Sequence, residues 1–292
     1  MSAPELPETP TISPTVGRRW LAQEVRRLRE AAGLKQSDVA KRLRCNQSKI
    51  GHMETMRNAI SGPDLEVMLP FLGVPPERID WYLQLADVAM EKGWWDGNRA
   101  IPEWFSLYIG LEWGASCVRE WDLGFVPGIL QTPAYADAVI RDGASASDKV
   151  LRMQTDARIQ RQAALMRTER PMELHAIIDE AALRRQIGGP TAMREQIEHL
   201  AIRSEQAQVT LQVMPFAAGP HRGQLGSFSC IDFDHVDDPG VVYVENQRGG
   251  LYLEEPEEIE VFRHVFDEVA SKALTPEDTG PFLSEIAKDF ES

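Results

Sequence analysis

Residues 34–54 read LKQSDVAKRLRCNQSKIGHME, and their spacing predicts two short helices joined by a tight turn. Val39, Ala40 and Leu43 give the first helix an apolar stripe, and Ile50 and Met53, three residues apart, give the second helix its own. Because so few residues separate the two stripes, the chain has to turn sharply between them. The stretch therefore predicts a pair of helices that pack against each other within one small domain.

The second helix of this pair presents polar side chains on its outer face. Asn46 precedes it, and an asparagine side chain at this position accepts a hydrogen bond from the free amides of the first turn. The residues left to point outward are Gln47, Ser48, Lys49 and His52. Side chains that pair with base edges and phosphates, carried on the second of two such helices, indicate a helix-turn-helix that binds DNA.

The distribution of charge supports a nucleic-acid partner, although the whole chain is acidic. Its 292 residues have a formal net charge of −14. Residues 15–75 carry eleven Lys and Arg against six Asp and Glu, a net +5, whereas the residues after 75 carry −17. A basic segment joined to an acidic body is expected of a DNA-binding domain with a separate sensor or partner module.

The N-terminal residues and the cysteines indicate a cytoplasmic protein. Residues 1–15, MSAPELPETPTISPT, are rich in Pro and Thr and lack an apolar core, so we expect a disordered arm and not a secretion signal. Cys45, Cys117 and Cys230 are far apart and predict neither a zinc site nor a disulfide framework. The chain has no run of about 18 apolar residues, so no membrane span is predicted.

The remaining patterns predict an α+β chain of two domains. Residues 16–92 are expected to form five helices. A break rich in Gly, Pro and Trp, GWWDGNRAIP, then opens a second domain at residues 93–292. That domain is expected to be mixed, with several helices and a mostly antiparallel sheet. A long helix is expected at 148–167, with Val150, Met153, Ala157 and Ala164 facing inward.

We find no pattern that predicts an enzyme, a cofactor or a metal site. The six histidines are dispersed, and Ser116, Ser227 and Ser229 lack a GxSxG elbow. Residues 232–238, DFDHVDD, are the best metal-like cluster, and we interpret them as a solvated acidic turn.

The order of several segments resembles a known bacterial family. They are GWW (93–95), VPGILQTPAYA (126–136), RIQRQ (158–162), DEAALRR (179–185), LQVMPF (211–216), VVYVE (241–245) and ALTPEDT (273–279). Residues 94–285 resemble the DUF5753 domain of Scr1-family, antitoxin-like regulators, and residues 17–73 resemble the Xre-type helix-turn-helix of the lambda and 434 repressors. The resemblance implies a transcription factor, often encoded beside a small DUF397 protein, without known catalytic residues or a settled ligand.

The repressor resemblance also assigns roles to individual residues. It places Gln47, Ser48 and His52 at base-facing positions and Gln36 against a phosphate, and it makes Arg29 and Glu54 an ion pair inside the domain. From their charge and position we add Lys35, Asn46, Lys49 and Arg57 as phosphate contacts. The family usually has Gly where this chain has Arg44, and a Gly is common where Met56 stands. If Arg44 needs a positive φ, it carries a strain cost.

Two hypotheses describe what the second domain does. In the first, it senses a small-molecule effector, and candidate pocket residues are Trp104, Tyr108, Arg119, Gln131, Tyr135 and Arg158. In the second, the protein is antitoxin-like, and its main role is to bind a DUF397-type partner. We interpret most of the aromatic residues as core. Repressors of this class bind two half-sites as dimers, so we expect a homodimer on an inverted-repeat operator in bacterial cytoplasm, nucleoid-associated when bound.

Overall fold

The computed structural model describes residues 13–290 except 143, 169 and 235–237. It divides into two compact units, residues 1–96 and 97–292, which we call the helical unit and the sheet unit. The boundary lies four residues after the predicted one. The predicted disordered arm falls mostly on residues 1–12, which lie outside the described residues.

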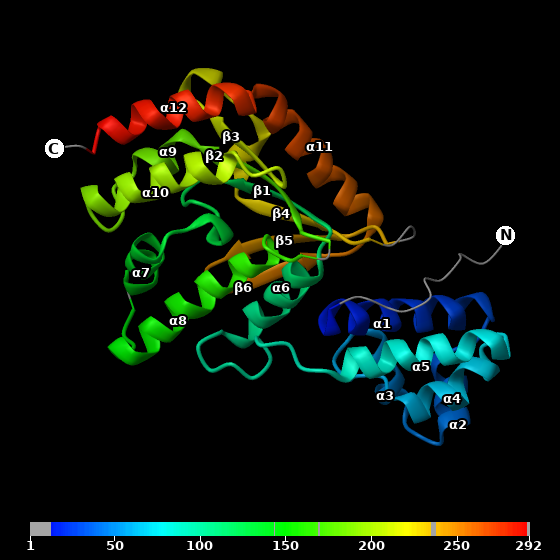
Figure 1. Ribbon diagram of the computed structural model, residues 1–292. Coiled ribbons are helices and arrows are strands. Elements are labelled where there is room, and N and C mark those ends of the chain that lie inside the picture. The colour runs from blue at the N-terminus through cyan, green and yellow to red at the C-terminus, as the bar shows by residue number, and fades with distance from the viewer. Residues whose placement is uncertain (1–12, 143, 169, 235–237, 291–292) are drawn as a thin grey trace. The chain divides into compact units, whose positions relative to one another are not determined.

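The described part of the helical unit consists of five helices (Figure 1). They are α1 (Pro14–Ala31), α2 (Gln36–Leu43), α3 (Gln47–Glu54), α4 (Gly62–Phe71) and α5 (Pro76–Met90). The predicted stripes meet in one core, where Val39, Ile50 and Met53 are almost completely buried. Burial of these apolar faces supplies the main free energy that holds helices this short in place.

The first helix begins earlier than predicted, so the last residues of the expected arm are ordered. Ser13 caps α1 by accepting a hydrogen bond from the amide of Val16 at 3.2 Å, and Pro14 occupies the first turn, where its missing N–H costs nothing. The hydroxyl of Thr15 accepts a hydrogen bond from the indole of Trp95 at 3.2 Å. The GWW segment, expected to open the second domain, therefore packs within the helical unit.

The sheet unit contains one six-stranded sheet in the order β3-β2-β1-β4-β5-β6. Its strands are β1 (Cys117–Asp122), β2 (Glu173–Asp179), β3 (Val209–Met214), β4 (Phe228–Asp232), β5 (Val241–Asn246) and β6 (Gly249–Leu253). The sheet is mixed: the β1-β4, β4-β5 and β5-β6 pairs are antiparallel, as predicted for most of the sheet, whereas β1, β2 and β3 are parallel to one another. Helices connect β1 to β2 and β2 to β3, and such crossovers return the chain in the same direction.

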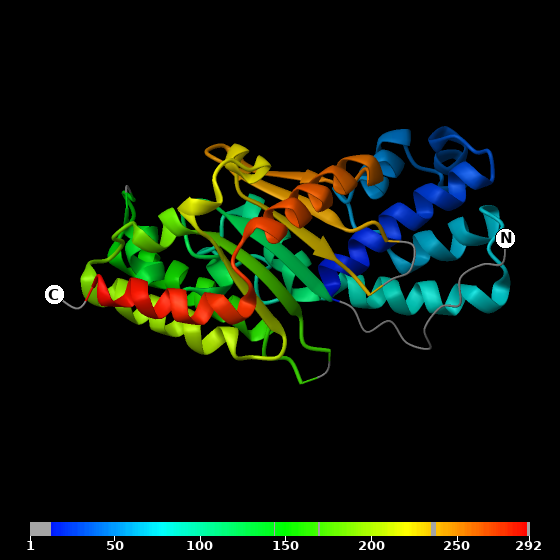
Figure 2. The same ribbon diagram turned by 90° about the horizontal axis from the view of Figure 1, so that it is seen from above.

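Helices lie on both faces of this sheet (Figures 1 and 2). They are α6 (Glu103–Gly114), α7 (Pro133–Arg141), α8 (Asp148–Gln160), α9 (Glu180–Arg184), α10 (Pro190–Ser204), α11 (Pro256–Lys272) and α12 (Pro276–Lys288). On one face, Trp121 packs with Phe266 and Val269 of α11. On the other, Tyr108 of α6 contacts Tyr243 of β5, with ring centroids 4.5 Å apart.

The helix predicted at 148–167 is shorter than expected and faces a different way. α8 ends at Gln160 and continues as the 3₁₀ helix η2 (Arg161–Ala164). Val150 and Met153, predicted to face inward, are exposed, whereas Ala157 and Ala164 are buried as predicted. Leu151, which was not predicted to face inward, is also buried.

The segments that carry the family resemblance hydrogen-bond one another. The side chain of Gln131 in VPGILQTPAYA donates to the carbonyl of Val126 at 2.8 Å, and its oxygen accepts from Arg158 of RIQRQ at 3.0 Å. Glu180 of DEAALRR accepts from the backbone amide of Phe216, the last residue of LQVMPF, at 2.7 Å. The bonds to Arg158 and Phe216 therefore join segments that are distant in sequence, and the bonds to Val126 and Phe216 satisfy backbone groups.

The structure shows the positive φ that would give Arg44, in the turn between α2 and α3, a strain cost. Arg44 has φ 55° and Met56 has φ 58°, both in the left-handed region that favours glycine.

We expect Arg44→Gly to stabilise the helical unit by about 0.5–1 kcal/mol, because glycine adopts this conformation without strain. Arg42→Gly is the matched control, since Arg42 is an exposed residue within α2, where glycine should destabilise by about 1 kcal/mol. Amide hydrogen exchange of α1–α5 in the full chain measures the change in stability that each variant causes. Equal destabilisation by the two variants would show that Arg44 is not strained.

Candidate DNA-binding surface and ligand cavity

The outer face of α3 is formed by the residues predicted to contact bases. Gln47, Ser48 and His52 are exposed there, and Asn46 is exposed at the helix start. The side-chain oxygen of Asn46 accepts from the amide of Lys49 at 2.9 Å, as its capping role requires. This bond satisfies one free amide of α3 and fixes where the helix begins.

The predicted phosphate contacts fall into two groups. Lys35, Asn46 and Arg57 are exposed. Lys49 instead forms an ion pair with Asp64 at 2.9 Å, and the amide of Gln36 donates to Glu54 at 2.8 Å. Lys49 and Gln36 thus already have partners inside the helical unit. Each would have to give up its partner to contact a phosphate.

Arg29 and Glu54 form a buried, two-pronged ion pair between α1 and α3. Arg29 Nε lies 2.5 Å from one carboxylate oxygen of Glu54, and Nη2 lies 3.0 Å from the other. A third guanidinium nitrogen donates to the carbonyl of Leu34 at 3.0 Å. The bond to Glu54 is the main reason that the pKa of Arg29 is raised. With Gln36, this group joins α1, α2 and α3 through one carboxylate.

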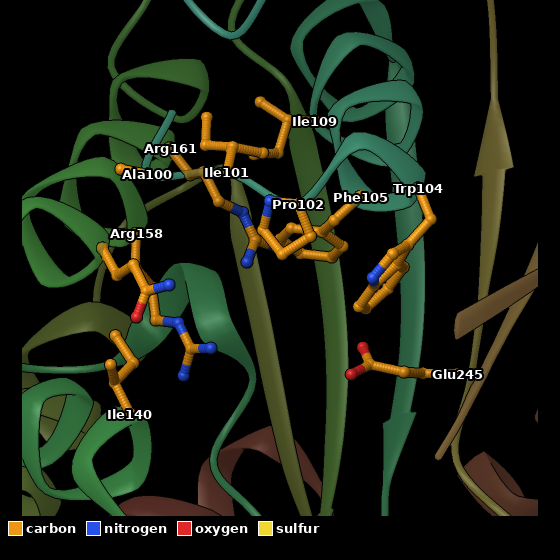
Figure 3. A pocket seen from close by; sticks show the side chains of 11 residues that line it. Ala100, Ile101, Pro102, Trp104, Phe105, Ile109, Ile140, Arg158, Arg161 and Glu245 are labelled. Carbon is orange, nitrogen blue, oxygen red and sulfur yellow. The ribbon is translucent and has the colours of Figure 1, made fainter. Parts of the chain in front are cut away.

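A cavity of about 220 Å³ lies within the sheet unit (Figure 3). Its apolar lining comes from residues 100–109 and from α7. Polar lining residues come from α8, η2 and β5. The full lining is Ala100, Ile101, Pro102, Trp104, Phe105, Ile109, Ile140, Gln154, Arg158, Arg161 and Glu245.

Of the six predicted pocket residues, two line the cavity and four do not. Trp104 and Arg158 line the cavity. Tyr108, Gln131 and Tyr135 are buried outside its lining. Tyr108 stacks on Phe105, Gln131 accepts from Arg158, and Tyr135 accepts from the amide of Val126.

Arg119 does not belong to this site. It forms an ion pair with Asp232 at 3.3 Å. Successive residues of a strand point to opposite faces. Arg119 therefore shares the face of Trp121, which packs under α11, and Glu120 shares the face of the cavity.

Arg161 is the buried residue that organises the cavity, and the sequence reasoning missed it. Its guanidinium bonds both carboxylate oxygens of Glu112, at 2.8 and 2.6 Å, and lies 5.1 Å from the ring centroid of Phe105. Burial lowers the pKa of Arg161, but Glu112 outweighs this effect and the pKa is raised. A Cβ on Gly128 would lie 2.6 Å from Arg161, so glycine is needed there.

Two carboxyl groups of β1 lie near the cavity. Burial, with repulsion from Asp122, raises the pKa of Glu120 well above its usual range. Burial also raises the pKa of Asp122 to about 7, and repulsion from Glu245 adds to this shift. Oε2 of Glu120 is buried and has no hydrogen-bond partner among the described residues. Protonated carboxyl groups are therefore stable at this face of the sheet.

The acidic segment at 232–238 behaves as ion-pair partners where it is described. Asp232 accepts from Arg263 at 2.5 Å, and Asp234 pairs with Arg170 at 2.7 Å. His235 and Asp237 lie outside the described residues. In the part of the chain that the structure covers, no group of three or more His, Cys, Asp or Glu could hold a metal ion. No described helix is long and apolar enough to span a membrane.

Comparison with known families agrees with this two-unit arrangement. Residues 20–81 match a helix-turn-helix domain, and residues 105–285 match the domain of unknown function DUF5753. The second match covers more than half of the chain. The chain belongs to the DUF5753 family. The sheet unit is thus its DUF5753 domain, and the helix-turn-helix match suggests a DNA-binding regulator. No curated protein and no solved structure matches the chain.

We expect Arg29→Met to destabilise the helical unit by about 3–5 kcal/mol, because it leaves the buried carboxylate of Glu54 without its charged partner. Arg26→Met is the control on the same helix. Arg26 pairs with Glu30 in solvent, and its loss should cost less than about 1 kcal/mol. Hydrogen exchange of α1–α3 in the full chain measures both. Similar small losses would mean that the ion pair is dispensable.

The DUF5753 domain should lose stability as pH rises from about 4 to about 7. The pKa of Asp122 is raised on folding, so the folded state binds more protons than the unfolded state across this range, and stability falls as they are released. Asp122→Asn should reduce the slope of unfolding free energy against pH in denaturant titrations. Asp142→Asn, an exposed residue, is the control. An unchanged slope in Asp122→Asn would contradict the raised pKa.

Proposed function

We propose that the chain is a sequence-specific transcriptional regulator that binds DNA as a dimer through residues 46–54 in the major groove. The observation that carries this proposal is the outer face of α3, where Gln47, Ser48 and His52 are exposed on a helix whose other face is core. A major groove admits one helix, and its base edges form a distinguishable pattern of donors and acceptors.

Gln47 is the most informative of the proposed base contacts. A glutamine side chain pairs with adenine through two hydrogen bonds, which are worth about 1–3 kcal/mol of discrimination. Lys35 and Arg57, both exposed, would contact phosphates beside it. Gln36 and Lys49 would join them by exchanging Glu54 and Asp64 for phosphates.

A dimer follows from the limited size of this surface. One short helix makes few phosphate contacts, and helix-turn-helix proteins commonly pair on half-sites about one helical turn apart. We therefore propose an inverted-repeat operator, with the DUF5753 domain as a source of dimer contacts. The setting proposed is the bacterial cytoplasm, with the protein on the nucleoid when bound.

We further propose that the DUF5753 domain senses a small molecule in its 220 Å³ cavity. Ala100, Ile101 and Pro102 line the cavity and follow the last residue of the helical unit, Asp96, by only a few positions in the chain. A ligand that contacts this segment would act on the covalent connection between the units. Binding and not catalysis is the proposed role, without a resident cofactor or metal.

The second candidate function is antitoxin-like capture of a small DUF397-type protein. Exposed apolar side chains favour it: Phe125 follows β1, Phe216 follows β3, and Leu225 is 95% exposed. Such side chains are typical of protein-binding surfaces. Pull-down with Phe216→Ser and Leu225→Ser distinguishes the candidates, because loss of a stoichiometric small protein, without loss of metabolite binding, would favour capture.

Phosphate-driven DNA binding predicts a steep loss of affinity with salt. We expect log K to fall linearly with log salt, on DNA selected from a random-sequence pool, with a slope of about −0.9 per phosphate contact. Lys35→Ala should weaken binding to all sequences alike and reduce the slope by about 1 per protomer. Lys149→Ala, an exposed lysine of the DUF5753 domain, should change neither. A wild-type slope near zero in gel shifts would refute the proposal.

A further inference from the structure

The cavity in the DUF5753 domain contains one arginine that has no carboxylate partner. Arg158 lines the cavity, and its only hydrogen bond among the described residues is to the neutral side chain of Gln131, at 3.0 Å. No ion pair of Arg158 is found in the described part of the chain. Arg161, in contrast, is neutralised by both oxygens of Glu112. The two arginines are close in sequence and line the same cavity. Arg161 has a carboxylate partner, whereas Arg158 has none among the described residues.

The environment of Arg158 makes an unpaired cation costly. Burial, with repulsion from Arg161, lowers the pKa of Arg158 to about 10. A guanidinium with this pKa still carries its charge at neutral pH. A partly buried charge without a partner is unfavourable, and an anion that enters the cavity would relieve that cost.

The nearby carboxyl groups do not supply this anion. Glu245 lies on the opposite side of the cavity from Arg158 (Figure 3) and accepts a hydrogen bond from Tyr243 at 3.3 Å. It is exposed, and although its attraction raises the pKa of Arg158, burial and repulsion from Arg161 outweigh that effect. The raised pKa of Glu120 favours its protonated form, and Asp122, with a pKa raised to about 7, is only about half ionised at neutral pH.

The rest of the lining fits an apolar body. Ile140 of α7 contributes to the apolar lining, and the other apolar residues come from one stretch of chain: Ala100, Ile101, Pro102, Trp104, Phe105 and Ile109. A dry apolar cavity of about 150 Å³ is enough to hold benzene, so about 220 Å³ accepts a ring or branched chain together with a charged group.

From this geometry we infer that the DUF5753 domain binds a monocarboxylate with an aromatic or branched apolar body, its carboxylate paired with Arg158. Glu245 on the far side repels a second carboxylate and accepts an N–H or O–H donor. Arg158 forms two parallel hydrogen bonds to the carboxylate, which a neutral amide cannot match. The inference names the ligand class for the proposed sensing role and rests on that proposal.

The test is calorimetric titration of the full chain with matched probes. They are phenylacetate, 3-phenylpropionate, indole-3-acetate and 4-methylvalerate, each beside its neutral amide and the corresponding amine. We expect saturable binding of at least one carboxylate, at least about tenfold tighter than its amide and amine. Preference for an amide or amine, or no binding by any carboxylate, would overturn the inference.

Variants assign the binding to Arg158. Arg158→Gln should weaken the carboxylate at least about tenfold, Arg158→Lys should retain part of the affinity, and Arg152→Gln, exposed on the same helix, should change nothing. Unchanged binding in a folded Arg158→Gln would also overturn the inference. Gel shifts without any probe separate the ligand class from the regulator proposal. If the protein binds DNA but no carboxylate, only the ligand class is rejected. If it does not bind DNA, the regulator proposal is rejected.

Discussion

The ion pair between Arg29 and Glu54 is the contact on which the candidate DNA-binding surface depends. It joins α1 to α3 through two hydrogen bonds, and Gln36 adds a third bond from α2 to the same carboxylate. A carboxylate on the outer face of α3 would repel DNA phosphates, whereas here it is buried and neutralised. Because a buried ion pair is satisfied in only one geometry, it fixes the orientation of α3 and so the side chains that α3 presents.

The DUF5753 domain uses the same kind of contact for a different purpose. Arg161 and Glu112 tie η2 to α6, and the absence of a side chain at Gly128 makes room for the guanidinium. Arg158, three residues earlier, is left with a neutral partner. One arginine therefore shapes the cavity and the other is available to a ligand.

Local patterns predicted the helical unit well and the cavity only in part. The stripes of α2 and α3 and the Asn46 cap depend on neighbours a few residues away, so the sequence contains them. The positive φ of Arg44 was expected from the family resemblance, because the family usually has Gly there. The Lys49–Asp64 pair and the parallel order of β1, β2 and β3 depend on contacts between distant segments. Because successive residues of a strand point to opposite faces, the sequence alone could have shown that Arg119 does not share the face of Glu120. No local signal joined Arg161 to Glu112, 49 residues apart.

The most direct test of the account is the sequence preference of α3. DNA fragments bound by the wild-type chain, by Gln47→Ala and by Gln224→Ala, an exposed control in the DUF5753 domain, would be selected from a random pool and sequenced. We expect two inverted half-sites about one helical turn apart, with Gln47→Ala losing preference at one symmetric base position while the spacing stays unchanged. The account would be contradicted if Gln47→Ala selected the same sequences as the wild-type chain, or if no half-site emerged.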